Sequence, residues 1–157
     1  MKFTIRNMDE DYAVEILNWR YESPYDFYNN EVNPDSLKEL LGGSYSIVLD
    51  QNNSLIGFFC TGDSAQVPAG RQFGAYSEAM VDLGIGMKPE LTGQGHGSTF
   101  FSFVLRYVQD NYEGVPIRLT VAKFNERAIH LYKKFGFVQR MGFNKATTRF
   151  IAMVKER

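Results

Sequence analysis

Three glycines, at positions 93, 95 and 97, follow a predicted strand at residues 79–87 and lead into a predicted helix at residues 97–112. The first turn of a helix carries backbone N–H groups without intrahelical partners, and the helix dipole adds partial positive charge there. Glycines allow a phosphate to approach those donors because no Cβ stands in the way. We therefore predict that this turn holds a phosphate or pyrophosphate, rather than being a flexible turn without a ligand.

Two common phosphate-binding turns fit this segment poorly. A P-loop requires a lysine and then Ser or Thr directly after its last glycine, whereas Gly97 is followed by Ser98 and Thr99. A dinucleotide-binding turn follows the first strand of its fold directly, whereas residues 88–92 separate the strand at 79–87 from Gly93. An unrelated nucleotide-binding domain that uses the glycine turn stays open as an alternative.

The elements that must position this turn follow from hydrophobic periodicity and turn residues. We predict helices at residues 9–20, 35–41, 97–112 and 126–135, and strands at residues 2–5, 45–49, 55–61, 79–87, 117–121, 137–143 and 148–154. This order is a mixed α/β arrangement with hairpins rather than a strict βαβ alternation. A length of 157 residues is close to that of one domain, so we predict a single domain over residues 1–157.

Composition excludes several classes of function. A net charge of -1, from 17 basic and 18 acidic residues, leaves no positive surplus for nucleic acid as the main partner. The chain contains no apolar run of about 18 residues, so we predict no membrane partner. The single cysteine, Cys60, cannot form an internal disulfide, which favours a reducing, cytoplasmic location. One cysteine and two isolated histidines do not predict a metal site.

Two segments together resemble the GNAT family of N-acetyltransferases. In that family the glycine turn reads Arg/Gln-x-x-Gly-x-Gly/Ala after a Pro-Glu pair, and here Pro89-Glu90 precedes matching glycines at 95 and 97. Thr92 takes the place of the Arg or Gln. The family's second segment reads Asn-x-x-Ala-x-x-x-Tyr-x-x-x-Gly-Phe. All five of its positions match, at Asn125, Ala128, Tyr132, Gly136 and Phe137.

The resemblance implies a GNAT-like fold, with a mixed, mostly antiparallel central sheet of about six to seven strands and helices on both faces. It also implies acetyl-CoA as co-substrate, between the strand ending at Met87 and the strand around Leu119. Backbone groups of Ile85 and Met87 would pair with the pantetheine arm, amides of residues 94–98 would hold the pyrophosphate, and Asn125 would bind the arm from the other side. The implied cofactor-binding residues are Ile85, Gly86, Met87, Thr92, Gly93, Gln94, Gly95, His96, Gly97, Ser98, Asn125 and Ala128.

The reaction implied by the resemblance is direct acyl transfer from a thioester to a neutral amine. Tyr132 is the candidate acid for the departing thiolate, because the pKa of a free tyrosine, about 10, is near that of a thiol. Periodicity alone would instead make Tyr132 a core residue, since it aligns with Ala128 and Phe135. Asp82 and Glu78 are the candidate bases, on or just before the strand that leads to the cofactor.

Residues 19–31, called here the acceptor segment, are rich in aromatic residues. In the family, the amine acceptor usually meets the first two helices and their connection. Tyr25, Phe27, Tyr28 and Glu31 could therefore form an aromatic wall with one carboxylate for an amine, although the same aromatics could simply cover the core. The resemblance implies an N-acetyltransferase acting on a primary amine of a small molecule or peptide, and a possible homodimer. A non-catalytic CoA-binding sensor or regulatory module is the alternative.

Overall fold

The computed structural model describes residues 2–156, which form two compact units. The first unit comprises residues 2–60 and 85–99, and the second comprises residues 61–84 and 100–156. β4 (Val81–Met87) and α3 (Gly97–Asn111) each contribute residues to both units. Each unit has hydrophobic packing of its own.

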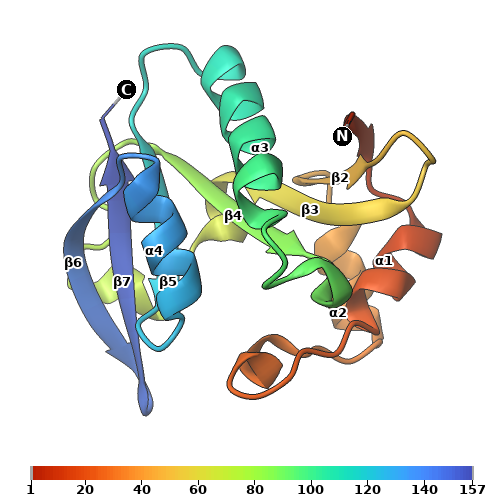
Figure 1. Ribbon diagram of the computed structural model, residues 1–157. Helices are drawn as coiled ribbons and strands as arrows, with labels where there is room; N and C mark the ends of the chain where they lie inside the picture. The colour runs from red at the N-terminus through yellow and green to blue at the C-terminus, as the bar shows by residue number, and fades with distance from the viewer. Residues whose placement is uncertain (1, 157) are drawn as a thin grey trace. The chain divides into compact units, whose positions relative to one another are not determined.

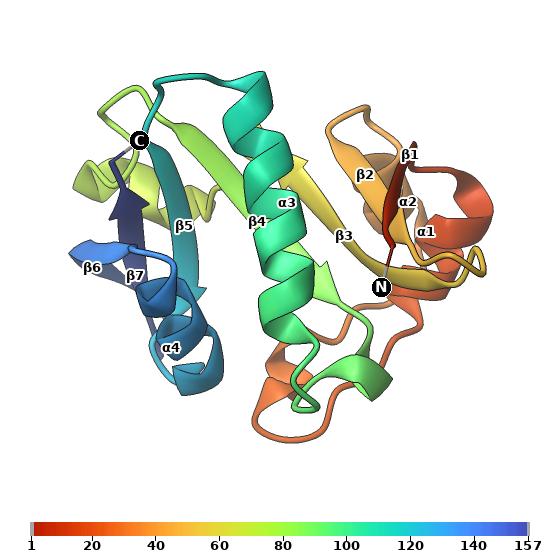
Figure 2. The ribbon, with the colours of Figure 1, turned by 45° about the horizontal axis from the view of Figure 1, so that its top comes forward.

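In the first unit, two helices cover one face of three antiparallel strands. β2 (Tyr45–Leu49) pairs with both β1 (Thr4–Asn7) and β3 (Leu55–Thr61). The helices begin at capping residues: Asp9 accepts an N–H at the start of α1 (Glu10–Leu17), and Asn33 does so for α2 (Pro34–Leu40). Figure 2 shows both helices behind the strands. The buried residues between helices and strands are Ala13, Ile16, Leu17, Trp19, Leu40, Ile47, Leu49 and Leu55.

The helix predicted at residues 9–20 is shorter in the structure, where α1 ends at Leu17. The Arg20 guanidinium group donates hydrogen bonds to the carbonyl oxygens of Leu17 at 3.1 Å and Trp19 at 2.7 Å. These bonds satisfy carbonyls that another helical turn would otherwise have engaged. The chain then enters the acceptor segment, which contains one short 3-10 helix, η1 (Tyr25–Tyr28).

The second unit is built around β5 (Ile117–Ala122). This strand pairs in parallel with β4 at residues 81–83 and antiparallel with β7 (Thr148–Lys155), which also pairs with β6 (Val138–Lys145). Figure 1 shows α4 (Glu126–Lys134) beside β5. The segment between β3 and β4 contains two 3-10 helices, η2 (Gly62–Ala65) and η3 (Pro68–Phe73). The apolar stripe of α3 is buried at Phe100, Phe101, Val104, Leu105 and Val108.

The hydrogen-bonded strand order is β1-β2-β3-β4-β5-β7-β6. The ladder between β4 and β5 is parallel, whereas four other ladders are antiparallel. The predicted mixed, mostly antiparallel sheet is therefore confirmed, at seven strands. The β6–β7 ladder continues beyond the predicted strand ends to the pair Lys145 and Thr148. The hairpin therefore turns at Ala146, which has a φ of 52°.

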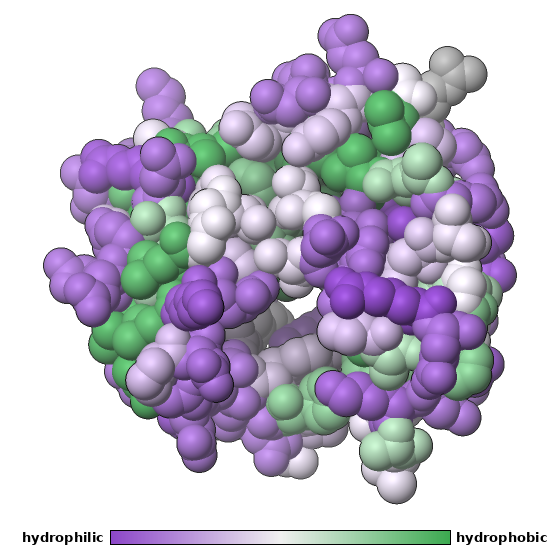
Figure 3. Space-filling view, turned by 180° about the vertical axis from the view of Figure 1, so that it is seen from behind, coloured by the Kyte–Doolittle hydropathy of each residue, from purple (hydrophilic) through white to green (hydrophobic). Residues whose placement is uncertain are grey.

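Hydrophilic residues occupy most of the face drawn in Figure 3, with hydrophobic residues in separate patches between them. Within residues 2–156, none of the helices has both the length and the apolar character that crossing a membrane requires.

Candidate active site

The glycine turn belongs to the first unit and folds back on itself before α3 begins. After the 3-10 helix η4 (Pro89–Leu91), the Thr92 hydroxyl donates to the Pro89 carbonyl oxygen at 2.7 Å, and the Gln94 side-chain amide donates to the Glu90 carbonyl oxygen at 2.8 Å. Thr92 therefore closes the turn locally, at the position where the family motif has a long polar side chain.

Two glycines of this turn have backbone conformations that other residues rarely adopt. Gly93 has a φ of 73° and Gly95 a φ of 83°, both in the left-handed region. A Cβ added at Gly95 would meet no atom within 4 Å, so that side of the turn is open. The chain then enters the 15-residue helix α3 at Gly97, whose first N–H groups can bind an anion. These local features fit the phosphates of a CoA ester.

The end of β4 lies against an aromatic side chain of β3. A Cβ added at Gly86 would overlap the ring of Phe58, so glycine is needed at this position. The Lys88 N–H donates to the Ile56 carbonyl oxygen at 2.8 Å and keeps β3 and the end of β4 together. Ile85, Gly86 and Met87 are all partly buried. The backbone groups of Ile85 and Met87 are those predicted to pair with the pantetheine arm.

The acceptor segment contacts this same end of β4. The Tyr21 hydroxyl donates to the Met87 carbonyl oxygen at 2.7 Å. Of the predicted acceptor residues, Phe27 is 48% exposed and meets Tyr28 edge-on at 5.2 Å between ring centroids. Tyr25 and Tyr28 are partly buried and Glu31 is exposed. Nearby, the Trp19 indole N–H is buried and has no hydrogen-bond partner among the described residues.

The second motif lies in the second unit and has clear local roles. The Asn125 side chain accepts the Ala128 N–H at 3.1 Å and so caps α4. Gly136 has a φ of 92°, which allows the chain to leave the helix. Tyr132 is 8% exposed, and its ring lies 5.1 Å from that of Phe101 and 6.2 Å from that of Phe137.

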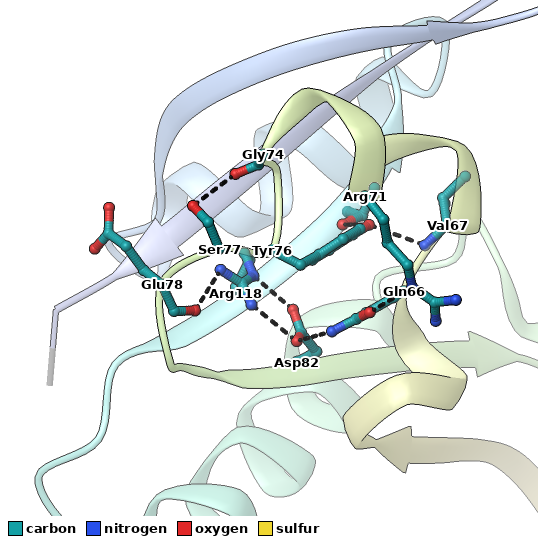
Figure 4. A network of polar contacts seen from close by, with 10 residues as sticks. Gln66, Val67, Arg71, Gly74, Tyr76, Ser77, Glu78, Asp82 and Arg118 are labelled. Atoms are coloured by element: carbon teal, nitrogen blue, oxygen red, sulfur yellow. Dashed lines mark hydrogen bonds and ion pairs between the residues drawn. The ribbon is translucent and has the colours of Figure 1, made fainter.

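A buried ion pair joins β4 to β5 in the second unit (Figure 4). Asp82 and Arg118 are each 4% exposed and are direct partners in the parallel ladder. Arg118 Nε lies 2.6 Å from Asp82 Oδ1, and Nη2 lies 2.9 Å from Oδ2. The Gln66 side-chain amide donates to the same Oδ2 at 2.9 Å. These three N–H groups take three of the about four acceptor sites of the Asp82 carboxylate, which leaves it little capacity for a substrate proton.

Glu78, the other candidate base, joins this network through its backbone only. Its carbonyl oxygen accepts from Arg118 Nη1 at 3.1 Å. Its side chain is 67% exposed and lies 3.7 Å from Arg140. Because the side chain is exposed, the Glu78 carboxylate is open to solvent. Exposed ion pairs of this kind contribute little to stability.

Sequence reasoning missed the residues that surround Asp82. The Tyr76 hydroxyl accepts the Val67 N–H at 2.9 Å and lies 2.8 Å from the Thr120 hydroxyl oxygen, while the Arg118 guanidinium stacks 5.0 Å from the Tyr76 ring centroid. One signal was present: Arg118 and Asp82 are opposite charges in two apolar strands. In the described part of the chain, no three His, Cys, Asp or Glu side chains gather as metal ligands would.

Known proteins resemble this chain in sequence pattern and in fold. The model of the acetyltransferase (GNAT) family matches residues 11–137. The spermidine N-acetyltransferase of Vibrio cholerae, solved with CoA and spermine, has a TM-score of 0.71 at 22% identity, covering 97% of this chain and 94% of that one. A chimera of that Vibrio cholerae enzyme and hSSAT has a TM-score of 0.71 at 22% identity, covering 99% and 96%. No curated protein matches this sequence.

Proposed function

Because the chain belongs to the acetyltransferase (GNAT) family, we propose that it transfers an acetyl group from acetyl-CoA to a primary amine of a small molecule or peptide. Membership of the family supports an acetyl-CoA-dependent N-acetyltransferase. The class of acceptor, a primary amine of a small molecule or peptide, is our proposal. The observation that carries the proposal is the open glycine turn at the start of α3, with left-handed glycines at positions 93 and 95.

The chain's own backbone would provide most of the contacts to acetyl-CoA. Amides from Gln94 to Ser98 would bind the pyrophosphate, and backbone groups of Ile85 and Met87 would pair with the pantetheine arm as an added strand does. The side-chain amide of Asn125 would form a hydrogen bond with the pantetheine arm. Backbone donors do not depend on the side chain at position 92, so the inward-turned Thr92 hydroxyl is compatible with binding.

The thioester supplies an activated acetyl group that a neutral amine can attack directly. We assign to the Tyr132 hydroxyl the proton that the departing thiolate takes up. Glu78 and Asp82 are the two candidates for accepting the amine proton, and Glu78 has the more accessible carboxylate.

The charge of the acceptor region favours a cationic amine. Residues 19–41 contain five carboxylates, at positions 22, 26, 31, 35 and 39, against two basic residues, Arg20 and Lys38. Carboxylates and exposed aromatic rings such as Phe27 attract ammonium groups. A relative of the same fold was solved with spermine. We therefore propose a polyamine such as spermidine as the first acceptor to test.

Calorimetric titration with acetyl-CoA tests the cofactor site. The variant Gly95→Glu places bulk and negative charge in the glycine turn. Gly114→Glu is the matched control, since Gly114 also has a left-handed φ, of 76°, and open space where a Cβ would lie. We expect micromolar binding by the wild-type protein and by Gly114→Glu, and none by Gly95→Glu. Absence of binding by the wild-type protein would overturn the proposal.

Mass spectrometry of the same samples with spermidine and other amines separates an enzyme from a binding module. Acetylated product that requires an intact glycine turn supports transfer. Binding of acetyl-CoA without product across a broad set of amines would favour the non-catalytic sensor, and displacement of the ligand by ATP or NAD but not by CoA would favour an unrelated nucleotide site.

We also propose that residues 1–157 form one acetyltransferase domain in the cytoplasm. The shared elements β4 and α3 support a single domain, because each supplies residues to both units. The one cysteine, Cys60, is buried and is not part of a disulfide, which suits a reducing compartment.

A further inference from the structure

We infer that Tyr21 is a positioning residue that couples the acceptor segment to acetyl-CoA binding at β4, an inference that rests on the proposed function. The hydroxyl of Tyr21 donates to the Met87 carbonyl oxygen at 2.7 Å, across 66 positions of sequence. Met87 is one of the residues whose backbone we propose to bind the pantetheine arm. The Met87 carbonyl oxygen therefore contacts the acceptor segment and also belongs to the strand that we propose to bind the pantetheine arm.

The backbone of Tyr21 is fixed at the same time as its side chain. Its N–H donates to the side-chain oxygen of Asn29 at 2.8 Å, which closes residues 21–29 into a loop. This loop includes η1 and with it Phe27 and Tyr28, two of the predicted acceptor residues. A displacement of Tyr21 would consequently be transmitted to the aromatic residues that we expect to meet the amine.

A second contact fixes the start of the segment beside the same part of β4. Trp19 is 7% exposed, and its ring lies 6.0 Å from that of Phe58. The Phe58 ring in turn occupies the space that a side chain at position 86 would need. The acceptor segment is thus tied to the end of β4 directly by the hydrogen bond at Met87 and indirectly through the Phe58 ring, which lies over Gly86.

The coupling follows from the chemistry of the shared carbonyl. A carbonyl oxygen has two lone pairs and can accept a second hydrogen bond. A ligand amide that donates to the Met87 oxygen would share this acceptor with Tyr21 and restrict the position of β4's end. A fixed Met87 oxygen holds the acceptor of the Tyr21 hydrogen bond in place, so binding of acetyl-CoA should order the acceptor segment, and an ordered segment should favour acetyl-CoA binding by the same factor.

Hydrogen–deuterium exchange of the full chain, with and without saturating acetyl-CoA, tests this coupling. The variant Tyr21→Phe removes the hydroxyl and keeps the ring. Tyr12→Phe is the matched control, because Tyr12 is a partly buried tyrosine that packs against the same core. In wild type and Tyr12→Phe we expect acetyl-CoA to slow exchange at residues 22–31 about threefold to tenfold, the range expected for one added or strengthened hydrogen bond.

In Tyr21→Phe we expect faster exchange of this segment without ligand and a response to acetyl-CoA below about twofold. Because the coupling is reciprocal, its affinity for acetyl-CoA should fall by no more than the same factor, about threefold to tenfold, so that saturating acetyl-CoA still fills the site. A merely structural hydroxyl would change the exchange without ligand but leave the response to acetyl-CoA intact. Equal protection by acetyl-CoA in Tyr21→Phe and wild type would therefore overturn the coupling alone. If the wild-type protein bound no acetyl-CoA in the titration, the proposed function would fall and the coupling with it.

Discussion

At the scale of single residues, the Tyr132 hydroxyl is the group that we propose to protonate the leaving thiolate. The ring packs between Phe101 and Phe137, and the variant Tyr132→Phe keeps that packing while it removes the proton donor. We expect turnover to fall tenfold or more, since general acid catalysis contributes about 10²–10⁴-fold. Steady-state kinetics with the amine that the protein acetylates measures turnover, and titration with acetyl-CoA measures cofactor affinity.

The matched control for this variant is Tyr107→Phe, which removes a hydroxyl from an exposed tyrosine on α3. Turnover of that variant should equal the wild-type value, and both variants should bind acetyl-CoA with little change in affinity. Unchanged turnover in Tyr132→Phe would return Tyr132 to the role of a core residue, which its helical periodicity alone would favour.

At the scale of elements, the Asp82–Arg118 pair holds β4 to β5 where the two strands run in parallel. Because both groups are buried, the variant Arg118→Met leaves Asp82 as an unpaired charge in the interior. Loss of one partner of a buried pair costs about 3–5 kcal/mol. We expect a decrease of this size in the free energy of unfolding, measured by urea denaturation.

Two further variants establish whether burial is the cause. Arg140→Met removes ion pairs with Glu78 and Glu156 at the surface, and should cost less than about 1 kcal/mol. The double variant Asp82→Leu/Arg118→Met removes both buried charges and should recover most of the lost stability. If the double variant were as unstable as Arg118→Met, the unpaired Asp82 charge would not be the cause of the instability.

At the scale of the whole molecule, we expect one cooperative unfolding transition for both units. A disruption of β4 or α3 affects both units, because these elements contribute residues to each. The single tryptophan, Trp19, belongs to the first unit, so its fluorescence reports that unit, whereas far-UV circular dichroism reports helices and strands of both. The two signals should give the same midpoint in urea, as two-state unfolding requires.

Separate midpoints would instead divide the chain into two independently unfolding parts and would contradict the single domain. Light scattering during gel filtration of the same preparation would test the predicted homodimer.

The sequence by itself was sufficient for the features that depend on neighbouring residues. A glycine turn before the helix at 97–111 was predicted, and Gly93 and Gly95 take left-handed φ values there. Hydrophobic periodicity identified, in their observed order, the seven strands and four α-helices that residues 2–156 contain. These features are local, since turn and cap conformations involve residues within one helical turn of each other. The sequence was also sufficient to indicate the family, because each of the two family motifs lies within one short, continuous segment of the chain.

Only the tertiary structure decided which distant residues meet. Asp82 and Arg118 are 36 positions apart, and Tyr21 and Met87 are 66 apart. Their contacts depend on strand order, register and the path of the acceptor segment, none of which is encoded in local periodicity. For this reason the sequence could place Asp82 among candidate bases but could not show that Arg118 and Gln66 already engage its carboxylate. The tie between Tyr21 and β4 likewise exists only because folding brings the acceptor segment against the end of that strand.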